Sequence, residues 1–180
     1  MRNFRQFMLL IMTVSLITLT SCSSDDDGGA PGGAPAGVLV AKVDGVSFQS
    51  LEISSSATIV DAGQAGRNLI IIATNSDGNA FSFTIIGYDG EGTYPIGGGA
   101  NIFNTASYTE TDVDLNNPLN STTEIWQAPY DDTVVGEINI SSETESKVIG
   151  TFDFTGKNVN GDQSLKNITE GSFDLDIMMN

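Results

Sequence analysis

Apolar and polar residues alternate with a period of two through much of the chain after residue 38. Residues 171–177 place Phe173 and Leu175 on one face and two aspartates on the other, and 136–140 and 147–155 alternate in the same way. This pattern is typical of strands in an antiparallel sheet that covers a core on one side and meets water on the other. The same region has no helical periodicity.

Two hairpins are expected in the first half of this region. Asp44-Gly45 joins residues 38–43 to 46–50, and this dipeptide favours a two-residue turn because both of its positions need positive φ. Residues 68–74 and 80–86 flank a second turn, and their continuous apolar runs predict burial on both faces. The sequence therefore predicts about eight to ten short strands in an all-β fold, either an antiparallel β-sandwich or a flattened, calycin-like barrel.

The beginning of the chain has the three parts of an export signal. Arg2 and Arg5 lie at the start, an apolar run follows over 7–17, and small or polar residues precede Cys22. The apolar run is about half as long as the roughly 20 residues that a membrane span needs. We expect a signal peptide over 1–21, a lipidated cysteine and tether over 22–37, and one domain over 38–180.

The motif Leu19-Thr20-Ser21-Cys22 resembles the lipobox of bacterial lipoproteins. The resemblance implies cleavage before Cys22 and attachment of acyl chains such as palmitate to that residue. Two or three acyl chains hold a protein stably on a membrane, whereas one chain does so only marginally. We therefore expect Cys22 to be the membrane anchor.

An acidic patch follows this cysteine, and it consists of Ser23, Ser24, Asp25, Asp26 and Asp27. The patch resembles the surface-export signal of Bacteroidota lipoproteins, which implies display on the outer face of the outer membrane. The alternative is a solvated charge run on a protein that faces the periplasm.

Residues 28–37 contain only Gly, Ala and Pro, a composition that gives a flexible tether.

Four strand-and-turn motifs carry a wider resemblance, and they lie at 41–48, 136–140, 149–156 and 168–173. Together they resemble a family of Bacteroidota lipoproteins that is known as a domain of unknown function. The resemblance implies one fold for nearly the whole mature domain, with the region 88–130 matching least. It brings no catalytic residues.

The charge of the chain excludes several classes of function. Without Arg2 and Arg5 the mature chain keeps five basic residues against 23 acidic ones, a net charge of −18. Such a surface repels nucleic acids and anionic lipid headgroups, and it favours a soluble monomer. The chain has no histidine and one cysteine, so Ser-His-Asp and Cys-His catalysis and zinc sites built on these residues are excluded.

Pairs of carboxylates are the first candidates for catalysis, because two such groups suffice for glycoside hydrolysis. The pairs close in sequence are Asp112 with Asp114, Asp131 with Asp132, Glu143 with Glu145, and Asp174 with Asp176. The last pair alternates with core residues, which is typical of a solvated strand face. Any acidic chain offers such pairs, so they favour catalysis only weakly.

Two loops contain residues that metals or phosphates use elsewhere. Residues 158–162 space oxygen ligands at alternate positions, as calcium loops do, but the late glutamate is missing and the composition is that of a turn. Gly97-Gly98-Gly99 lacks the Lys-Ser/Thr pair of a phosphate-binding loop. We expect no cofactor and no metal.

Aromatic residues are the remaining candidates for ligand binding, because exposed Trp and Tyr contribute strongly to recognition. They are Tyr94, Tyr108, Trp126 and Tyr130. Trp126 and Ile125 are adjacent in an alternating segment, so Trp126 points outward if Ile125 points inward; the alternative is a tryptophan in the core.

Asp132-Thr133-Val134 resembles the Bacteroidota O-glycosylation motif, which implies Thr133 as the acceptor.

These observations favour a lipid-anchored cell-surface protein with a non-catalytic binding module for a glycan, a protein or a matrix component. A calycin-like carrier of a small apolar ligand is the alternative, and it requires a large apolar interior. A carboxylate-dependent glycosidase is less favoured.

Overall fold

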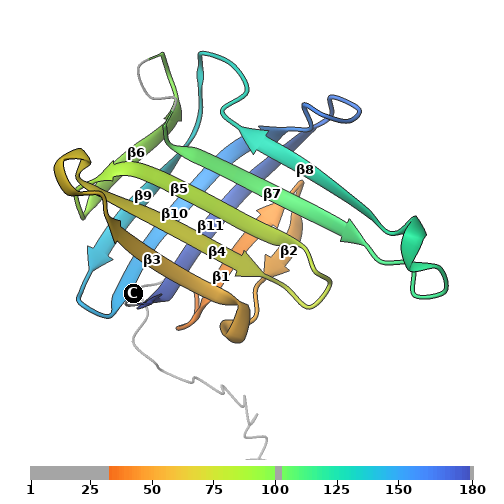
Figure 1. The fold of residues 1–180 in the computed structure, drawn as a ribbon, viewed down its shortest axis with the longest axis horizontal. Coiled ribbons are helices and arrows are strands. Elements are labelled where there is room, and N and C mark those ends of the chain that lie inside the picture. Colours follow the sequence, from red (N-terminus) through yellow and green to blue (C-terminus); the bar gives the residue numbers. More distant parts are fainter. Residues whose placement is uncertain (1–32, 100–102, 179–180) are drawn as a thin grey trace, which may run out of the picture.

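The computed structural model describes residues 33–99 and 103–178, and it is built from β-strands (Figure 1). The strands are β1 (Val38–Val43), β2 (Val46–Gln49), β3 (Ser55–Asp61), β4 (Arg67–Thr74), β5 (Ala80–Tyr88), β6 (Gly92–Gly97), β7 (Thr105–Asp112), β8 (Thr122–Ala128), β9 (Val134–Glu143), β10 (Lys147–Lys157) and β11 (Leu165–Met178). Three short 3-10 helices are η1 (Glu52–Ser54), η2 (Gly63–Ala65) and η3 (Pro118–Asn120). The predicted all-β class is confirmed.

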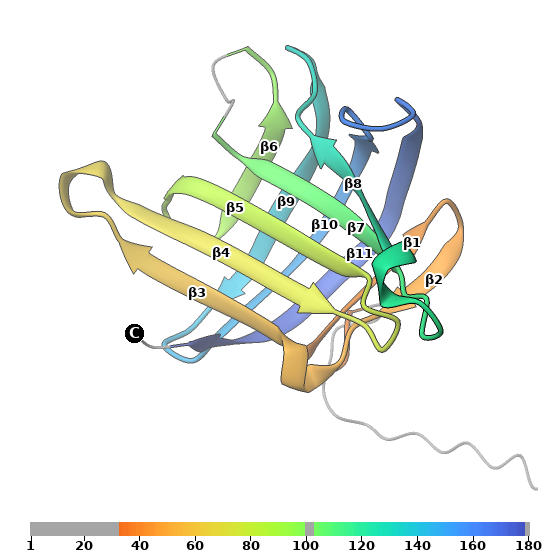
Figure 2. The same ribbon diagram turned by 45° about the vertical axis from the view of Figure 1, so that its right-hand side comes forward.

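The strands form two layers that cross each other (Figures 1 and 2). The back layer has the order β2-β1-β11-β10-β9-β6, and the front layer has the order β3-β4-β5-β7-β8. Short pairings connect the layers at two corners: β11 runs parallel to β3 at Ile177–Ala57, and β8 pairs with β10 at Gln127–Lys157. The result is a mixed sheet folded over on itself, as expected for a sandwich or flattened barrel.

Both predicted hairpins are present. Asp44 and Gly45 have φ of 49° and 82° between β1 and β2, as the two-residue turn requires. Asn75 closes the turn between β4 and β5, because its side-chain oxygen accepts hydrogen bonds from the backbone N–H groups of Asp77 and Asn79. Gly37, predicted to belong to the tether, donates a backbone hydrogen bond to Asp174 in β11 and so joins the sheet.

The prediction that 68–74 and 80–86 are buried on both faces is wrong. Ile72 is 49% exposed and Ile86 is 46% exposed on the outer face of the front layer. They lie there among Ser and Thr side chains of neighbouring strands, such as Ser82 opposite Ile72. A continuous apolar run is also compatible with a half-buried pleated surface, because β-branched residues fit such a surface well.

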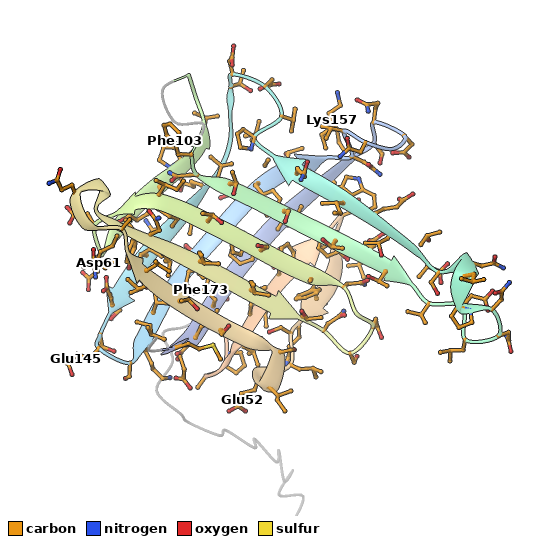
Figure 3. All side chains as sticks on the ribbon, viewed as in Figure 1. Glu52, Asp61, Phe103, Glu145, Lys157 and Phe173 are labelled. Carbon is orange, nitrogen blue, oxygen red and sulfur yellow. The ribbon has the colours of Figure 1, made fainter. Side chains whose placement is uncertain are left out.

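The core between the layers consists mainly of aromatic rings. Phe83 of the front layer lies 4.7 Å, centroid to centroid, from Phe152 of the back layer, and Phe81 lies 5.5 Å from the same ring. Phe173 is fully buried between the layers (Figure 3). These rings occupy the centre of the space in which a calycin-like carrier would hold its ligand.

Glycines of the back layer lie opposite these rings. Gly171 pairs with Phe152, Gly150 pairs with Phe173, and Gly136 pairs with Phe154. A Cβ atom on Gly150 would lie 2.6 Å from the ring of Phe173, which is too close. The recurring glycines of the C-terminal third therefore make room for aromatic rings on the neighbouring strand.

Candidate functional site

Two of the four candidate aromatics belong to the core. Trp126 is 3% exposed and Tyr108 is buried beside it, whereas Ile125 is 41% exposed, so the interpretation of Trp126 as an outward residue is wrong. Trp126 Nε1 donates a hydrogen bond to Ser164 Oγ at 3.0 Å, and the Lys166 ammonium lies 4.4 Å from the centre of the indole ring. The larger indole ring of Trp126 fills the corner between the layers, and the smaller side chain of Ile125 lies on the outer face.

The other two tyrosines lie on different elements. Tyr94 on β6 is half-buried, and its hydroxyl donates to the carbonyl of Gly90 and accepts from the backbone N–H of Asp89. Tyr130, just after β8, is half-buried and lines a surface hollow. The structure therefore keeps Tyr130 as the one predicted aromatic that lies at a hollow.

Polar side chains cover the outer face of the back layer in two rows across the strands. The strand register gives the first row as Asn139, Thr151, Ser172 and Gln49, with the apolar Val40 between the last two, and Ser172 is 4% exposed. The second row lies one pleat away, and it contains Glu137, Asp153, Glu170, Lys42 and Ser47. Each row runs from β9 to β2.

Three hollows lie along these rows and share residues. One of about 640 Å³ extends from Tyr130 and Thr133 to Asp153. One of about 410 Å³ lies between Asp153 and Glu170, and one of about 340 Å³ lies between Glu170 and the β1–β2 hairpin. We call these three shallow hollows, which adjoin at Asp153 and Glu170, the back-layer groove. It is the candidate binding site.

Glu170 lies at the centre of the groove in an unusual backbone conformation. Its φ is 52°, a left-handed value that a residue with a Cβ adopts only at a cost. The strand register shifts here against both β1 and β10, so β11 carries a β-bulge at this point. Bulges re-aim side chains and are frequent beside functional sites. The Glu170 carboxylate pairs with the Lys42 ammonium at 2.8 Å.

Glu137 and Asp153 form a carboxylate pair that sequence spacing does not reveal. They lie directly opposite each other on β9 and β10, and both line the hollow of about 640 Å³. None of the ion pairs formed within the described ranges includes either carboxylate. Like charges in this arrangement destabilise a sheet, so this position is not explained by folding alone.

The carboxylate pairs that are close in sequence have other roles, and none of them lines the three hollows. Glu143 is held by Arg67 with an N–O distance of 2.7 Å, and Asp174 is held by Lys147 at 2.8 Å. Hydrogen bonds from backbone N–H groups of the following turn lower the pKa of Asp114. Hydrogen bonds from Thr133 likewise lower the pKa of Asp131.

The loop 158–162 is a turn, as expected. Hydrogen bonds from the side chain and then the backbone N–H of Ser164 lower the pKa of Asp162. Across the part of the chain that the structure describes, three or more acidic side chains do not converge as a metal site would require. The loop at Gly97 packs against the carbonyl of Thr133, which lies on an exposed turn.

The predicted anchor and export residues lie outside the described residues. They are Cys22, Ser23, Ser24, Asp25, Asp26 and Asp27. The helices that are described, η1 to η3, fall far short of the length and hydropathy of a membrane span.

Residues 36–174 match a protein family described as a domain of unknown function, DUF6252. The chain belongs to the DUF6252 family. The predicted membership of a family of unknown function is thereby confirmed, and the matched region contains every residue of the back-layer groove. Neither the curated proteins nor the solved structures provide a significant match to the chain.

Proposed function

We propose that this protein is a Bacteroidota surface lipoprotein whose DUF6252 domain is a non-catalytic binding module. The observation that carries the proposal is the back-layer groove, in which three hollows adjoin on one face of one layer. A ligand would lie on this face across the strands. Such an open site is suited to capturing a ligand, since both the rows of polar side chains and their hollows face solvent.

The predicted N-terminal segments support this proposal because they would carry the domain to the cell surface. Acylation of Cys22 would anchor the protein in the outer membrane, and Asp25, Asp26 and Asp27 would direct it to the cell exterior. A tether from residue 23 to 37 has an r.m.s. reach of roughly 20 Å, which lifts the groove off the lipid. A net charge of −18 for the mature chain keeps the domain monomeric and away from anionic headgroups and nucleic acids.

The interior favours a surface site over an internal one. Phe81, Phe83 and Phe152 fill the centre of the fold with ring centroids 4.7 to 6.1 Å apart. A carrier of a small apolar ligand needs a cavity there, of a few hundred Å³. The outer groove therefore supports the binding function better than the core does.

A glycosidase is the second candidate, and the Glu137–Asp153 pair favours it. Two carboxylates are the minimum that glycoside hydrolysis requires, and these two lie side by side at one hollow. We rank it second because catalytic groups usually lie in concave pockets, whereas both of these side chains are exposed on an open face of the sheet.

The test is a set of melting temperatures measured with soluble glycans, peptides and small molecules in turn. A ligand present at 100 times its Kd stabilises the folded state by about 2.7 kcal/mol. We expect a ligand that raises the melting temperature of the wild type but not of Asp153→Arg, in which a long side chain fills the groove. Ser82→Arg, on the outer face of the front layer, should respond as the wild type does.

Equal stabilisation of Asp153→Arg by every ligand would show that the groove is not the binding site. Shortening of a bound polysaccharide, abolished by Glu137→Gln, would show that the domain is a glycosidase.

A further inference from the structure

We infer that the ligand of the back-layer groove is a neutral glycan chain, and that Glu170 accepts hydrogen bonds from its hydroxyl groups at the centre of the groove. This inference rests on the proposed function and adds the chemical class of the ligand. Four features of the groove carry it: the chemistry of its lining, its charge, its length and the conformation of Glu170.

Side chains that complement hydroxyls line the groove, next to apolar groups such as Val40 and Val134. Asp153 and Glu170 can only accept hydrogen bonds when ionised, whereas Thr151 and Gln49 both donate and accept. A sugar ring presents hydroxyls around its edge, and each hydroxyl also donates and accepts. The centre of a protein–protein interface differs, because aromatic residues, Met and Arg are enriched there and Asp, Glu and Ser are depleted.

The charge of the groove disfavours acidic glycans. Glu137, Asp153 and Glu170 face the solvent along it. Lys42 lines the groove but is paired with Glu170, and the Lys157 ammonium at the Tyr130 end lies 6.0 Å from the centre of that ring. An anionic sugar would meet these carboxylates in the field of a domain with a net charge of −18. A neutral chain avoids this repulsion and still satisfies the acceptors.

The length of the groove suits a chain of several sugar units. The hollows span strands β2, β1, β11, β10 and β9, and four strand spacings of about 4.8 Å give roughly 19 Å. Tyr130 lies at one end, where its half-buried ring borders the groove and the Lys157 ammonium lies over it, 6.0 Å from its centre. The β1–β2 hairpin, with Ser47 and Gln49, closes the other end.

The position and the backbone conformation of Glu170 both favour a role in binding. Its φ of 52° is strained for glutamate, and glycine would adopt it freely. The bulge directs its side chain onto the outer face, where two of the three hollows share it. Strain of this kind persists where function requires the side chain.

The experiment is affinity electrophoresis of the purified full-length protein in detergent, through native gels containing one polysaccharide each. The neutral probes are galactomannan, arabinoxylan, mixed-linkage β-glucan, dextran and starch, and the acidic probes are alginate and polygalacturonate. We expect at least one neutral polymer to retard the wild type relative to a polymer-free gel, and neither acidic polymer to do so.

Glu170→Gly should lower the affinity for that neutral polymer about tenfold or more, because a hydrogen bond to a charged group contributes a factor of roughly ten to a hundred. The substitution suits the left-handed backbone, so the fold should survive. Glu145→Ala is the matched control, since Glu145 is an exposed carboxylate in the β9–β10 turn outside the groove (Figure 3) and should bind as the wild type does.

Retardation by no neutral polymer, retardation by an acidic one, or unchanged affinity in Glu170→Gly would each overturn the inference. If another class of ligand then raises the melting temperature in a manner that Asp153→Arg abolishes, the proposed function stands without its glycan. If no ligand does so, both fail.

Discussion

Glu170 is the residue at which the requirements of folding and of binding diverge. A left-handed conformation costs a residue with a Cβ about 1–2 kcal/mol, and the exposed pair with Lys42 returns between zero and about 1 kcal/mol. Selection for stability alone would place glycine here. The same position faces the middle of the back-layer groove, where the proposed binding function would use the carboxylate.

We predict that Glu170→Gly raises the free energy of unfolding by about 0.5 kcal/mol while it weakens binding, because relief of strain exceeds the lost ion pair. Urea denaturation measures this change. Lys42→Met, which removes the same ion pair but keeps the glutamate, should lower stability slightly or leave it unchanged. A loss of more than 1 kcal/mol in Glu170→Gly would mean that the fold itself needs the glutamate.

Two buried tyrosines predict how stability depends on pH. Burial raises the pKa of Tyr88 and of Tyr108 above the usual value of about 10. Above pH 10 the unfolded chain therefore loses phenolic protons that the folded chain keeps, so stability is lost as the pH rises further. The urea midpoint should fall between pH 9 and 11, and less steeply in the variant Tyr88→Phe/Tyr108→Phe. Identical slopes in the two proteins would refute this explanation.

At the scale of elements, the back layer depends on pairs of glycine and phenylalanine on neighbouring strands. β9, β10 and β11 each contribute a glycine that lies opposite a ring, so the rings can approach the backbone closely. This arrangement leaves the outer face of the same strands free for polar side chains. The groove and the aromatic core are thus the two faces of one layer.

Gly150→Ala should destabilise the fold by about 1–3 kcal/mol, because the new methyl group would overlap the ring of Phe173 and the carbonyl of Asn139. Chemical denaturation monitored by tryptophan fluorescence gives the value. The control is Thr151→Ala at the next position, whose side chain points to solvent and whose loss should change stability by less than about 0.5 kcal/mol.

The sequence predicts an element well when the pattern that specifies it lies within that element's own residues. The alternation in β10 and β11 predicted both strands and the buried faces of Phe152 and Phe173, since one buried face requires a period of two. The alternation around Trp126 allowed either orientation, and the tertiary packing decided it. The Glu137–Asp153 pair depends on the register between two strands, which no local pattern contains.

The whole molecule combines an acidic domain with a predicted lipid anchor. The net charge of −18 for the mature chain disfavours contact with anionic surfaces, so the proposed attachment to a membrane would depend on the anchor and the tether. The described domain would then stand away from the bilayer with its groove open to the medium.

Replacement of Cys22 with Ala should abolish lipidation and membrane attachment. Cells labelled with radioactive palmitate should yield a labelled band for the wild type and none for the variant, which should leave the membrane fraction. A variant that still carries label and sediments with membranes would refute the anchor.

The most direct measurement of the central claim, that a binding groove is displayed on the cell exterior, is the binding of a fluorescent ligand to intact cells. The ligand is the neutral polysaccharide that retards the purified protein most. We predict that cells with the wild type or Ser82→Arg bind it, and that cells with Asp153→Arg, or with Asn in place of Asp25, Asp26 and Asp27, do not. Binding by Asp153→Arg cells equal to that of the wild type, at equal protein levels, would contradict the claim.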